Sequence, residues 1–447
     1  MKSRSERRAG HEMSNQDRTV LIVFPGPFSM GRIDKLVANI EKELQSKNIK
    51  LKNTAIENEW LVFEMDDVIE GAGITREMFG IDKVAIAKKV PSIQFENIVA
   101  EVVNIGKLKV LPNEKFFVKV QLSNNAQMNY RSRDLEFVST GDLTAALQSS
   151  SFSSSCRPTF SPISRISSSH SYSSSARPAK NELEADRLIE IFVGKKSAYV
   201  TIETDLGPGG LPFACQGEKV LCSIHDTLSA ISCMIALKCG FFPEIVIVYT
   251  DDYDLRKNLK IFGMIVNKMS IKNYSIRLVQ LDYGNDSGFD KILDLKQHGQ
   301  RKLQRTTKLQ LESSHKAVLQ EIVATQILTL MKGKGVVVPL SVVIHPLWLI
   351  QSTFKKILAS KKIPWMPLLL PSHGMYDIAE ELGIEKNMLP SLSYKGSKMN
   401  RLMTFTRQDY AKYRTTIDKM TESAKKNMKT ISFEIGPNYL HDILDSV

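Results

Sequence analysis

Apolar positions in the first half of the chain follow mostly short alternating runs, the pattern of strands with one buried face. Residues 19–26 predict a strand that ends in a turn, and residues 51–65 predict two further short strands. Between them, residues 31–46 carry apolar side chains at helical spacing. The order strand, helix, strand, strand predicts a small α+β unit.

A second unit of the same kind is expected to begin near Phe79. Its helix within 134–147 has two possible capping residues, Thr140 and Asp142. Two alternating runs joined by Gly-Lys-Lys predict a hairpin. The expected elements are a strand, a helix, a strand, a helix and this hairpin, in residues 82–91, 95–108, 115–122, 134–147 and 187–204.

From residue 218 onward the pattern changes to long alternating strands and helices. Continuous β-branched runs between helices predict a parallel sheet that is covered on both faces. The expected strands are 219–224, 244–250, 275–283, 336–343 and 366–371. The expected helices are 228–240, 255–270, 313–335 and 346–360, followed by a basic amphipathic helix near 408–428.

Two segments have a composition that does not support a folded core. Residues 148–180 are nearly half serine with scattered arginine and proline, so we expect a disordered loop inserted into a folded domain. Residues 1–18 are basic and polar, and predict a disordered leader rather than a secretory signal. No apolar run approaches the ~20 residues that a membrane-spanning helix needs.

Charge and cysteine content narrow the class of protein. The formal net charge is +12 and the isoelectric point is near 9.2, which fits a polyanionic partner or simple solubility. The five cysteines form no CxxC pair, and no group of residues has the spacing of a zinc site. An odd number of cysteines without a regular spacing fits a reducing cytosol, so we expect a cytoplasmic protein.

Several short motifs occur in an order that resembles the tRNA 4-thiouridine synthetases (tRNA sulfurtransferases). In that family a ferredoxin-like domain and a THUMP domain precede a PP-loop domain that binds ATP. The motifs are Gly26 with the helix after it, Phe79-Gly80-Ile81, Met128 to Leu147, Gly194 to Glu203, Gly209 to Pro212 with Gly217, and Gly374-Met375.

The resemblance covers roughly residues 19–390 and implies an α/β architecture with a doubly wound parallel sheet in the PP-loop domain. It implies a ferredoxin-like domain at 19–75, a THUMP domain at 76–206 that carries the serine-rich insert, and a PP-loop-like domain at 207–390. Residues 391–447 are then a basic helical extension.

The pyrophosphate loop of that family, Ser-Gly-Gly-x-Asp-Ser, aligns with Ile224 to Ser229, where only Ser229 matches. His225 and Asp226 replace the two glycines that allow close approach of a phosphate to the backbone. A carboxylate ~4 Å from a phosphate charge costs about 4 kcal/mol at an effective dielectric near 20. We therefore expect Asp226 to cap the following helix, and His225 to be an exposed loop residue.

Two further departures weaken the case for the family's chemistry. The family transfers sulfur through a cysteine downstream of the loop, but no cysteine follows Cys239. Pro339 and Pro346 replace the small turn that contacts phosphate in the relatives. A catalytically degenerate protein with no cofactor is therefore expected, and Gly217 and Ser229 are the remnants of the ATP site.

The resemblance also implies contact with the acceptor end of tRNA. Lys88 and Lys89, then Tyr130, Arg131 and Arg133, are the candidate contacts in the first half, with a solvated loop and a packed tyrosine as the alternative. In the second half the candidates share one helical face, as either an RNA-binding stripe or a solvated surface. They are Arg301, Arg305 and Lys308.

Three functions remain open from the sequence. The first is a tRNA-binding protein without catalysis, and the second is an active ATP-dependent sulfurtransferase. The active enzyme would form 4-thiouridine, would receive sulfur from a carrier protein and would also supply thiamine thiazole synthesis. The third is a protein–protein scaffold. The relatives also suggest a homodimer.

Overall fold

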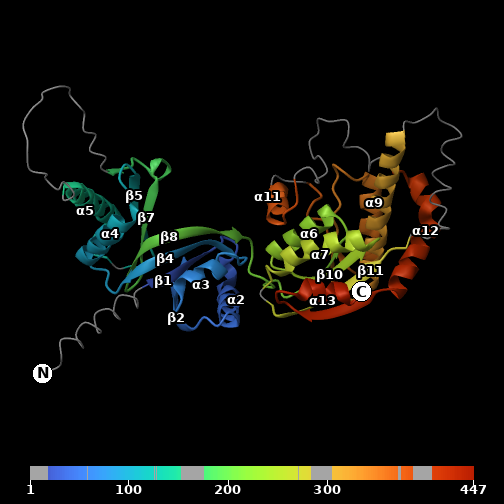
Figure 1. Ribbon diagram of the computed structural model, residues 1–447, viewed down its shortest axis with the longest axis horizontal. Coiled ribbons are helices and arrows are strands. Elements are labelled where there is room, and N and C mark those ends of the chain that lie inside the picture. The colour runs from blue at the N-terminus through green and yellow to red at the C-terminus, as the bar shows by residue number, and fades with distance from the viewer. Residues whose placement is uncertain are drawn as a thin grey trace, which may run out of the picture. The chain divides into compact units, whose positions relative to one another are not determined.

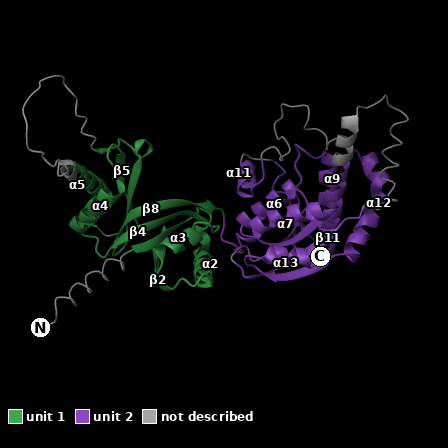
Figure 2. Cartoon of the chain, in the orientation of Figure 1, with its two compact units in different colours: residues 1–210 green, residues 211–447 purple. Residues whose placement is uncertain are grey.

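The computed structural model describes residues 19–152 except 58, 125 and 127, residues 176–282 except 270, and residues 305–370, 374–385 and 405–447. The chain divides into two compact units, Met1–Gly210 and Leu211–Val447 (Figure 2). The expected leader (1–18) and most of the expected serine-rich insert lie outside the described residues.

Unit 1 is built on one eight-stranded sheet with the order β2-β3-β1-β4-β8-β7-β5-β6 (Figure 1). Its elements are β1 Thr19–Pro25, α2 Ile33–Ser46, β2 Leu51–Glu57, β3 Trp60–Met65, α3 Val68–Thr75, β4 Ile81–Val90, α4 Phe95–Lys109, β5 Lys115–Leu122, α5 Ser132–Phe152, β6 Arg177–Pro178, β7 Arg187–Val193 and β8 Ala198–Gly209. The predicted strands, first helix and hairpin are all present.

One sheet joins the two domains that the resemblance implies for this half. Strand β1 pairs antiparallel with β4, with Ile22 opposite Ala85, so the ladder crosses the expected boundary at residue 75. Helices α2 and α3 pack on the sheet through a core that includes Leu36, Ile40 and Phe63. Helices α4 and α5 cover β5, β7 and β8 through a separate core.

Local details of unit 1 differ from the prediction at three places. Helix α3 was not predicted, although Asp67 caps it by accepting a hydrogen bond from the Glu70 amide. Thr140 and Asp142 do not cap a helix, because both lie inside α5, where the Thr140 hydroxyl donates to the Glu136 carbonyl at 2.7 Å. Helix α5 and strand β6 both extend into the expected 148–180 insert.

Unit 2 contains a six-stranded sheet with the order β13-β12-β9-β10-β11-β14. Five strands are parallel and β14 is antiparallel to β11. The elements are β9 Lys219–Ile224, α6 Thr227–Lys238, β10 Phe242–Tyr249, α7 Asp252–Val266, β11 Asn273–Gln280, α9 Arg305–Leu330, β12 Gly335–Val337, α10 Leu347–Ala359, β13 Ile363–Trp365, α11 Gly374–Glu381, α12 Arg407–Lys426, β14 Lys429–Glu434 and α13 Tyr439–Asp445.

Helices cover both faces of this sheet, as the sequence predicts. Alternate side chains of the strands point to opposite faces, so Leu221, Val246 and Val279 join the core formed with α9, α10 and α12. On the other face, α6 and α7 contact β9 and β10 (Figure 1). No helix in the described ranges combines the length and apolar character needed to cross a bilayer.

The C-terminal part of unit 2 differs most from the prediction. Of the predicted strand 366–371, the described residues 366–370 are not a strand, and the edge strand β13 lies just before them. The predicted strand 336–343 is mostly loop, because β12 ends at Val337. The segment expected as a helical extension adds β14 to the sheet, with Ile276 opposite Ile431.

Candidate functional site

The carboxyl ends of β9 and β12 mark the natural site for a ligand in unit 2. The chain goes from β9 to β10 and β11 on one side, then crosses to β12 and β13 on the other. In open parallel sheets, ligands bind outside the strand ends at this reversal of strand order. The segment from His225 to Ser229, which aligns with the pyrophosphate loop, lies at this point.

The first turn of α6 is closed by its own side chains. The Asp226 carboxylate accepts a hydrogen bond from the Ser229 amide at 2.7 Å. The Ser229 hydroxyl oxygen accepts from the amides of His225 and Asp226 at 3.0 and 2.9 Å, and donates to the Asp226 carbonyl at 2.8 Å. The predicted cap by Asp226 is confirmed, and it is a reciprocal capping box.

His225 is buried, and the expectation of an exposed loop residue was wrong. The residue is 5% exposed, and its Nε2 lies 2.8 Å from Oε2 of Glu321, which is also 5% exposed. This is an ion-pair distance, although the ring N–H is poorly aligned for a hydrogen bond. Glu321 belongs to α9, so no local signal around residue 225 could reveal the contact.

The charges around His225 decide its protonation. Burial lowers the pKa of His225, but Asp226, the Glu321 carboxylate and Asp254 together raise it above its ordinary value. The raised pKa favours the imidazolium, whose charge the three carboxylates balance. The other oxygen of Glu321 accepts a hydrogen bond from the Thr325 hydroxyl at 3.2 Å.

A second histidine follows β12 at the same end of the sheet. His345 is buried, and burial lowers its pKa. Its Nδ1 accepts a hydrogen bond from the Ser341 amide at 3.1 Å, as a neutral imidazole does. Pro346 then precedes α10 as its N-cap residue, without a side-chain cap. This turn is therefore held by His345, where the relatives are expected to have a small phosphate-contacting turn.

Two cysteines of this region, Cys222 and Cys239, are thiols rather than thiolates. Burial and the neighbouring Cys233 raise the pKa of Cys222 well above its ordinary value. Burial also raises the pKa of Cys239. A high thiol pKa disfavours the nucleophilic thiolate, so these side chains are structural. Gly217 has a φ of +70°, in the turn that leads into β9.

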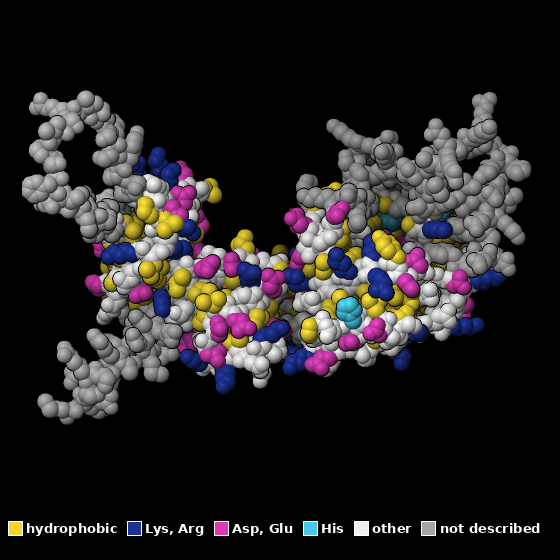
Figure 3. Space-filling model, in the orientation of Figure 1, with side chains coloured by type: hydrophobic (Ala, Val, Ile, Leu, Met, Phe, Trp, Pro, Cys, Tyr) yellow, Lys and Arg dark blue, Asp and Glu magenta, His cyan; other side chains and the backbone are white. Residues whose placement is uncertain are grey.

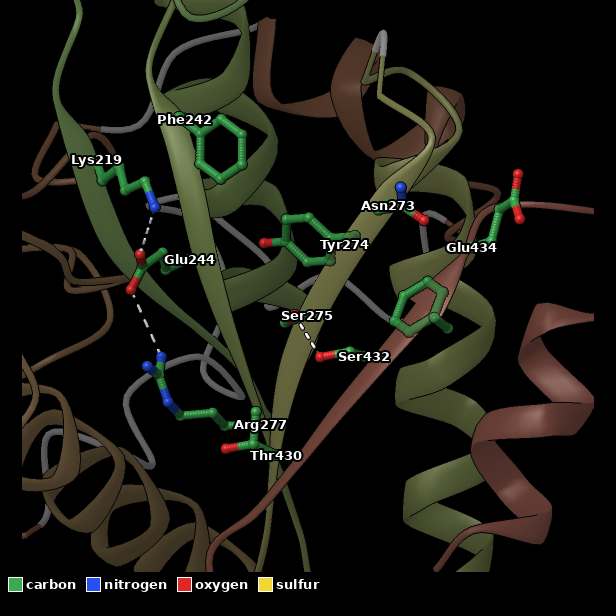
Figure 4. Close-up of a pocket in the computed structure, with 11 residues that line it drawn as sticks. Lys219, Phe242, Glu244, Asn273, Tyr274, Ser275, Arg277, Thr430, Ser432 and Glu434 are labelled. Atoms are coloured by element: carbon green, nitrogen blue, oxygen red, sulfur yellow. Dashed lines mark hydrogen bonds and ion pairs between the residues drawn. The ribbon is translucent and has the colours of Figure 1, made fainter.

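A separate cavity of about 530 Å³ lies at the opposite ends of the unit 2 strands (Figure 4). The Glu244 carboxylate forms ion pairs with Lys219 at 3.1 Å and with Arg277 at 3.5 Å. The hydroxyl groups of Ser275 and Ser432 are hydrogen-bonded at 2.7 Å. These polar groups satisfy one another. Within the described ranges, no group of three metal-binding side chains forms a metal site in either place.

The candidate RNA contacts of unit 1 are spread over two elements. Lys88 and Lys89 lie on β4, and the Lys89 ammonium pairs with Glu64 at 2.6 Å. The Tyr130 hydroxyl donates to the Ile93 carbonyl at 2.6 Å, and its ring packs edge-on against Phe95. Tyr130 is therefore a packed residue.

The remaining candidate RNA contacts are either exposed or have no described side chain. Arg131 and Arg133 are exposed at the start of α5. Arg301 lies outside the described residues. Arg305 and Lys308 belong to the first turns of α9, where the backbone alone is described. The proposed basic stripe of these three residues therefore stays a prediction.

Helix α12 carries a set of exposed basic residues. The helix was predicted as basic, but its side chains were not proposed as contacts. The exposed cations of α12 are Arg407, Lys412, Arg414, Lys419, Lys425 and Lys426. Lys412, Lys419 and Lys426 are spaced seven residues apart, which is a signal that the sequence carries.

Comparisons with known proteins agree on the fold. No protein-family model and no curated protein sequence matches the chain. Among solved structures, a 4-thiouridine synthetase in complex with RNA and bound ATP matches 93% of this chain and all of its own, with 14% identity and a TM-score of 0.55. The Pyrococcus horikoshii protein PH1313 matches 82% of this chain and all of its own, with 18% identity and a TM-score of 0.51.

These likenesses confirm that the chain has the THUMP and PP-loop type of fold that the resemblance predicts. The identities are low, so they are evidence for fold alone. The ATP site, the RNA contacts and the exact domain boundaries therefore depend on the residues of this chain.

Proposed function

We propose that this protein binds structured RNA of the tRNA class and does not use ATP at the junction of β9 and α6. The observation that carries the proposal is the closed first turn of α6, within a fold that spans the whole length of the synthetase neighbour. A protein of this fold that cannot hold a phosphate there keeps only the binding part of the relatives' function.

The loss of ATP binding follows from the contacts at the loop. A phosphate at a helix N-terminus needs free backbone N–H groups and the positive end of the helix dipole. Here Asp226 and Ser229 occupy three of these amides, and the Asp226 carboxylate adds a negative charge at the same place. The helix dipole, worth about 0.3–1 kcal/mol, does not offset a carboxylate–phosphate repulsion of about 4 kcal/mol.

The RNA part of the proposal is supported by the neighbour and by charge. The 4-thiouridine synthetase neighbour, which matches 93% of this chain, was solved with RNA bound. The net charge of +12 favours a polyanionic partner, because Lys and Arg displace counterions from phosphates. The charge lies mainly in unit 2, where residues 211–447 hold 32 Lys and Arg against 22 Asp and Glu.

Binding of an unmodified tRNA transcript by the full chain, measured across a series of KCl concentrations, tests this proposal. We expect log K to fall linearly with log salt, by about 0.7–0.9 for each phosphate contact. Calorimetric titration with ATP is expected to give no heat of binding, whether or not tRNA is present.

Two results would contradict the proposal. One is saturable ATP binding at this site. The other is 4-thiouridine in the tRNA nucleosides after incubation with ATP and a persulfide donor, measured by mass spectrometry, which would restore the active sulfurtransferase. RNA binding that does not change with salt would remove the electrostatic basis of the proposal.

A further inference from the structure

Helix α12 presents three regularly spaced lysines, which we call the α12 stripe: Lys412, Lys419 and Lys426. The exposed Glu422 lies on the same face between the last two. All three lysine side chains are exposed. Because seven residues are almost two helical turns, the three lysines lie on one face, about 10.5 Å apart along the helix axis. In Figure 3, dark-blue side chains lie along the edge of unit 2 over α12.

The opposite face of α12 fixes the stripe in place. Tyr413, Ile417, Met420 and Ala424 are buried in the core shared with α9 and α10. A capping box between Thr406 and Asp409 closes the N-terminus of the helix. The lysines therefore project from a helix whose orientation within unit 2 is set by packing.

The neighbouring helix α10 contributes Lys356, whose positive charge lies near the carboxylate of Asp418 on α12. Lys356 is exposed and lies near Asp418 and Arg414 of α12, and its pKa is lowered by partial desolvation and by Arg414, against the opposing effect of Asp418. Asp418 therefore has two cationic neighbours. Trp348 of α10 joins the helices, because its indole N–H donates to the Phe405 carbonyl at 3.0 Å and its ring packs on Tyr410.

We propose that the α12 stripe contacts the phosphate backbone of the RNA, an inference that rests on the proposed function. Positive side chains at regular intervals along one rigid helix contact a backbone without reading base sequence. An anionic membrane is the weaker match. Helices that lie on membranes insert an apolar face, whereas no large apolar side chain of α12 is among the exposed ones of the described chain.

The test replaces all three lysines with glutamine in the full chain, as K412Q/K419Q/K426Q. The matched control is R256Q/K257Q/K260Q, which removes three exposed charges from α7 of the same unit. With a tRNA transcript at about 0.15 M KCl, we expect the stripe variant to bind at least tenfold more weakly and its salt slope to fall by about 2–3. The control is expected to stay within about twofold of the unchanged protein.

One more variant and one more titration complete the test. K412R/K419R/K426R keeps the charge and should keep the affinity and the slope, while thermal unfolding shows that each variant is folded. Vesicles containing phosphatidylserine replace the RNA in a parallel titration.

The outcomes separate this inference from the proposed function. If the unchanged protein does not bind tRNA, the proposed function fails. If tRNA binds but the stripe variant equals the α7 control, the inference fails and the proposed function stands. A stripe variant that loses vesicle binding and keeps tRNA binding would assign α12 to a membrane and overturn the inference.

Discussion

His225 shows how the surroundings of one residue set its chemistry. Its imidazole is surrounded by the carboxylates of Glu321, Asp226 and Asp254. A buried charge is tolerated only where it is paired, and removing one partner of a buried pair typically costs about 3–5 kcal/mol. Loss of either partner would therefore destabilise the structure at the ends of β9 and β12.

The substitution Glu321→Gln is expected to lower the stability of unit 2 by about 3 kcal/mol near pH 6, because it leaves the buried imidazolium without its closest partner. The pKa of His225 is raised in the folded protein, so the pair's contribution is complete below the unfolded value of about 6.5. It is lost as pH rises through the folded pKa. Urea unfolding at several pH values should show the difference between the two proteins shrinking as pH increases.

Thr325→Val is the control for this prediction, because it removes a hydrogen bond to Glu321 and no charge. Its effect should be about 1 kcal/mol and nearly independent of pH above 6. If the loss of unfolding free energy in Glu321→Gln stays constant or grows as pH rises, His225 is neutral in the folded protein.

Among the elements, α6 has a first turn that is stabilised by hydrogen bonds to its own side chains. Ser229 accepts two amide hydrogen bonds, and Asp226 accepts a third from the Ser229 amide. Sequence predicted this cap correctly, because capping depends on residues within one turn of each other. The same contacts explain why Ser229, which aligns with the last serine of the family's loop, has a different role here.

Substitution Ser229→Ala should destabilise unit 2 by about 1–2 kcal/mol, since two buried amides lose their acceptor. Thermal unfolding measures this effect. Ser232→Ala is the matched control on the same helix, because its buried hydroxyl has no partner within the described residues, and it should be close to neutral. Equal losses of stability in the two variants would contradict the role given to Ser229. The affinity for tRNA should not change in either variant.

On the scale of the whole molecule, the last strand closes the sheet of unit 2. Strand β14 pairs with β11 along all six of its residues, and Phe433 stacks on Tyr439 of α13. The Tyr439 hydroxyl donates to the Gly263 carbonyl of α7 at 3.3 Å. Residues from the end of the chain are therefore part of the core that holds α7 and β11.

A chain that ends after Asn427 is expected to lose stability in unit 2 alone, because Tyr274 and Phe262 lose the cover of Phe433. Calorimetry should show an earlier transition for unit 2 and an unchanged one for unit 1, whose sheet contains no residue of this segment. Phe433→Ala should have a smaller effect in the same direction. An unchanged unit 2 transition in the shortened chain would mean that β14 is a dispensable extension.

The elements that sequence predicted well are those with a strong local pattern. The apolar runs of β9 and β10, the alternating pattern of β11 and the helical spacing of α2 and α7 each depend on neighbouring residues. Strand β14 has the alternating pattern of a strand, but it is only six residues long and contains two apolar side chains, Ile431 and Phe433. Its place at the sheet edge depends on β11, which is far away in the sequence.

By itself, the sequence determined the order of α+β and parallel α/β units, the missing glycines of the phosphate loop and the cap of α6. All of these follow from residue type and short-range spacing, which act through backbone conformation and hydrogen bonds within a few residues. Only the tertiary structure decided that His225 is buried against Glu321, that Tyr130 is packed and that β14 completes the second sheet. These facts depend on contacts between residues that are distant in the chain, and local periodicity carries no information about such contacts.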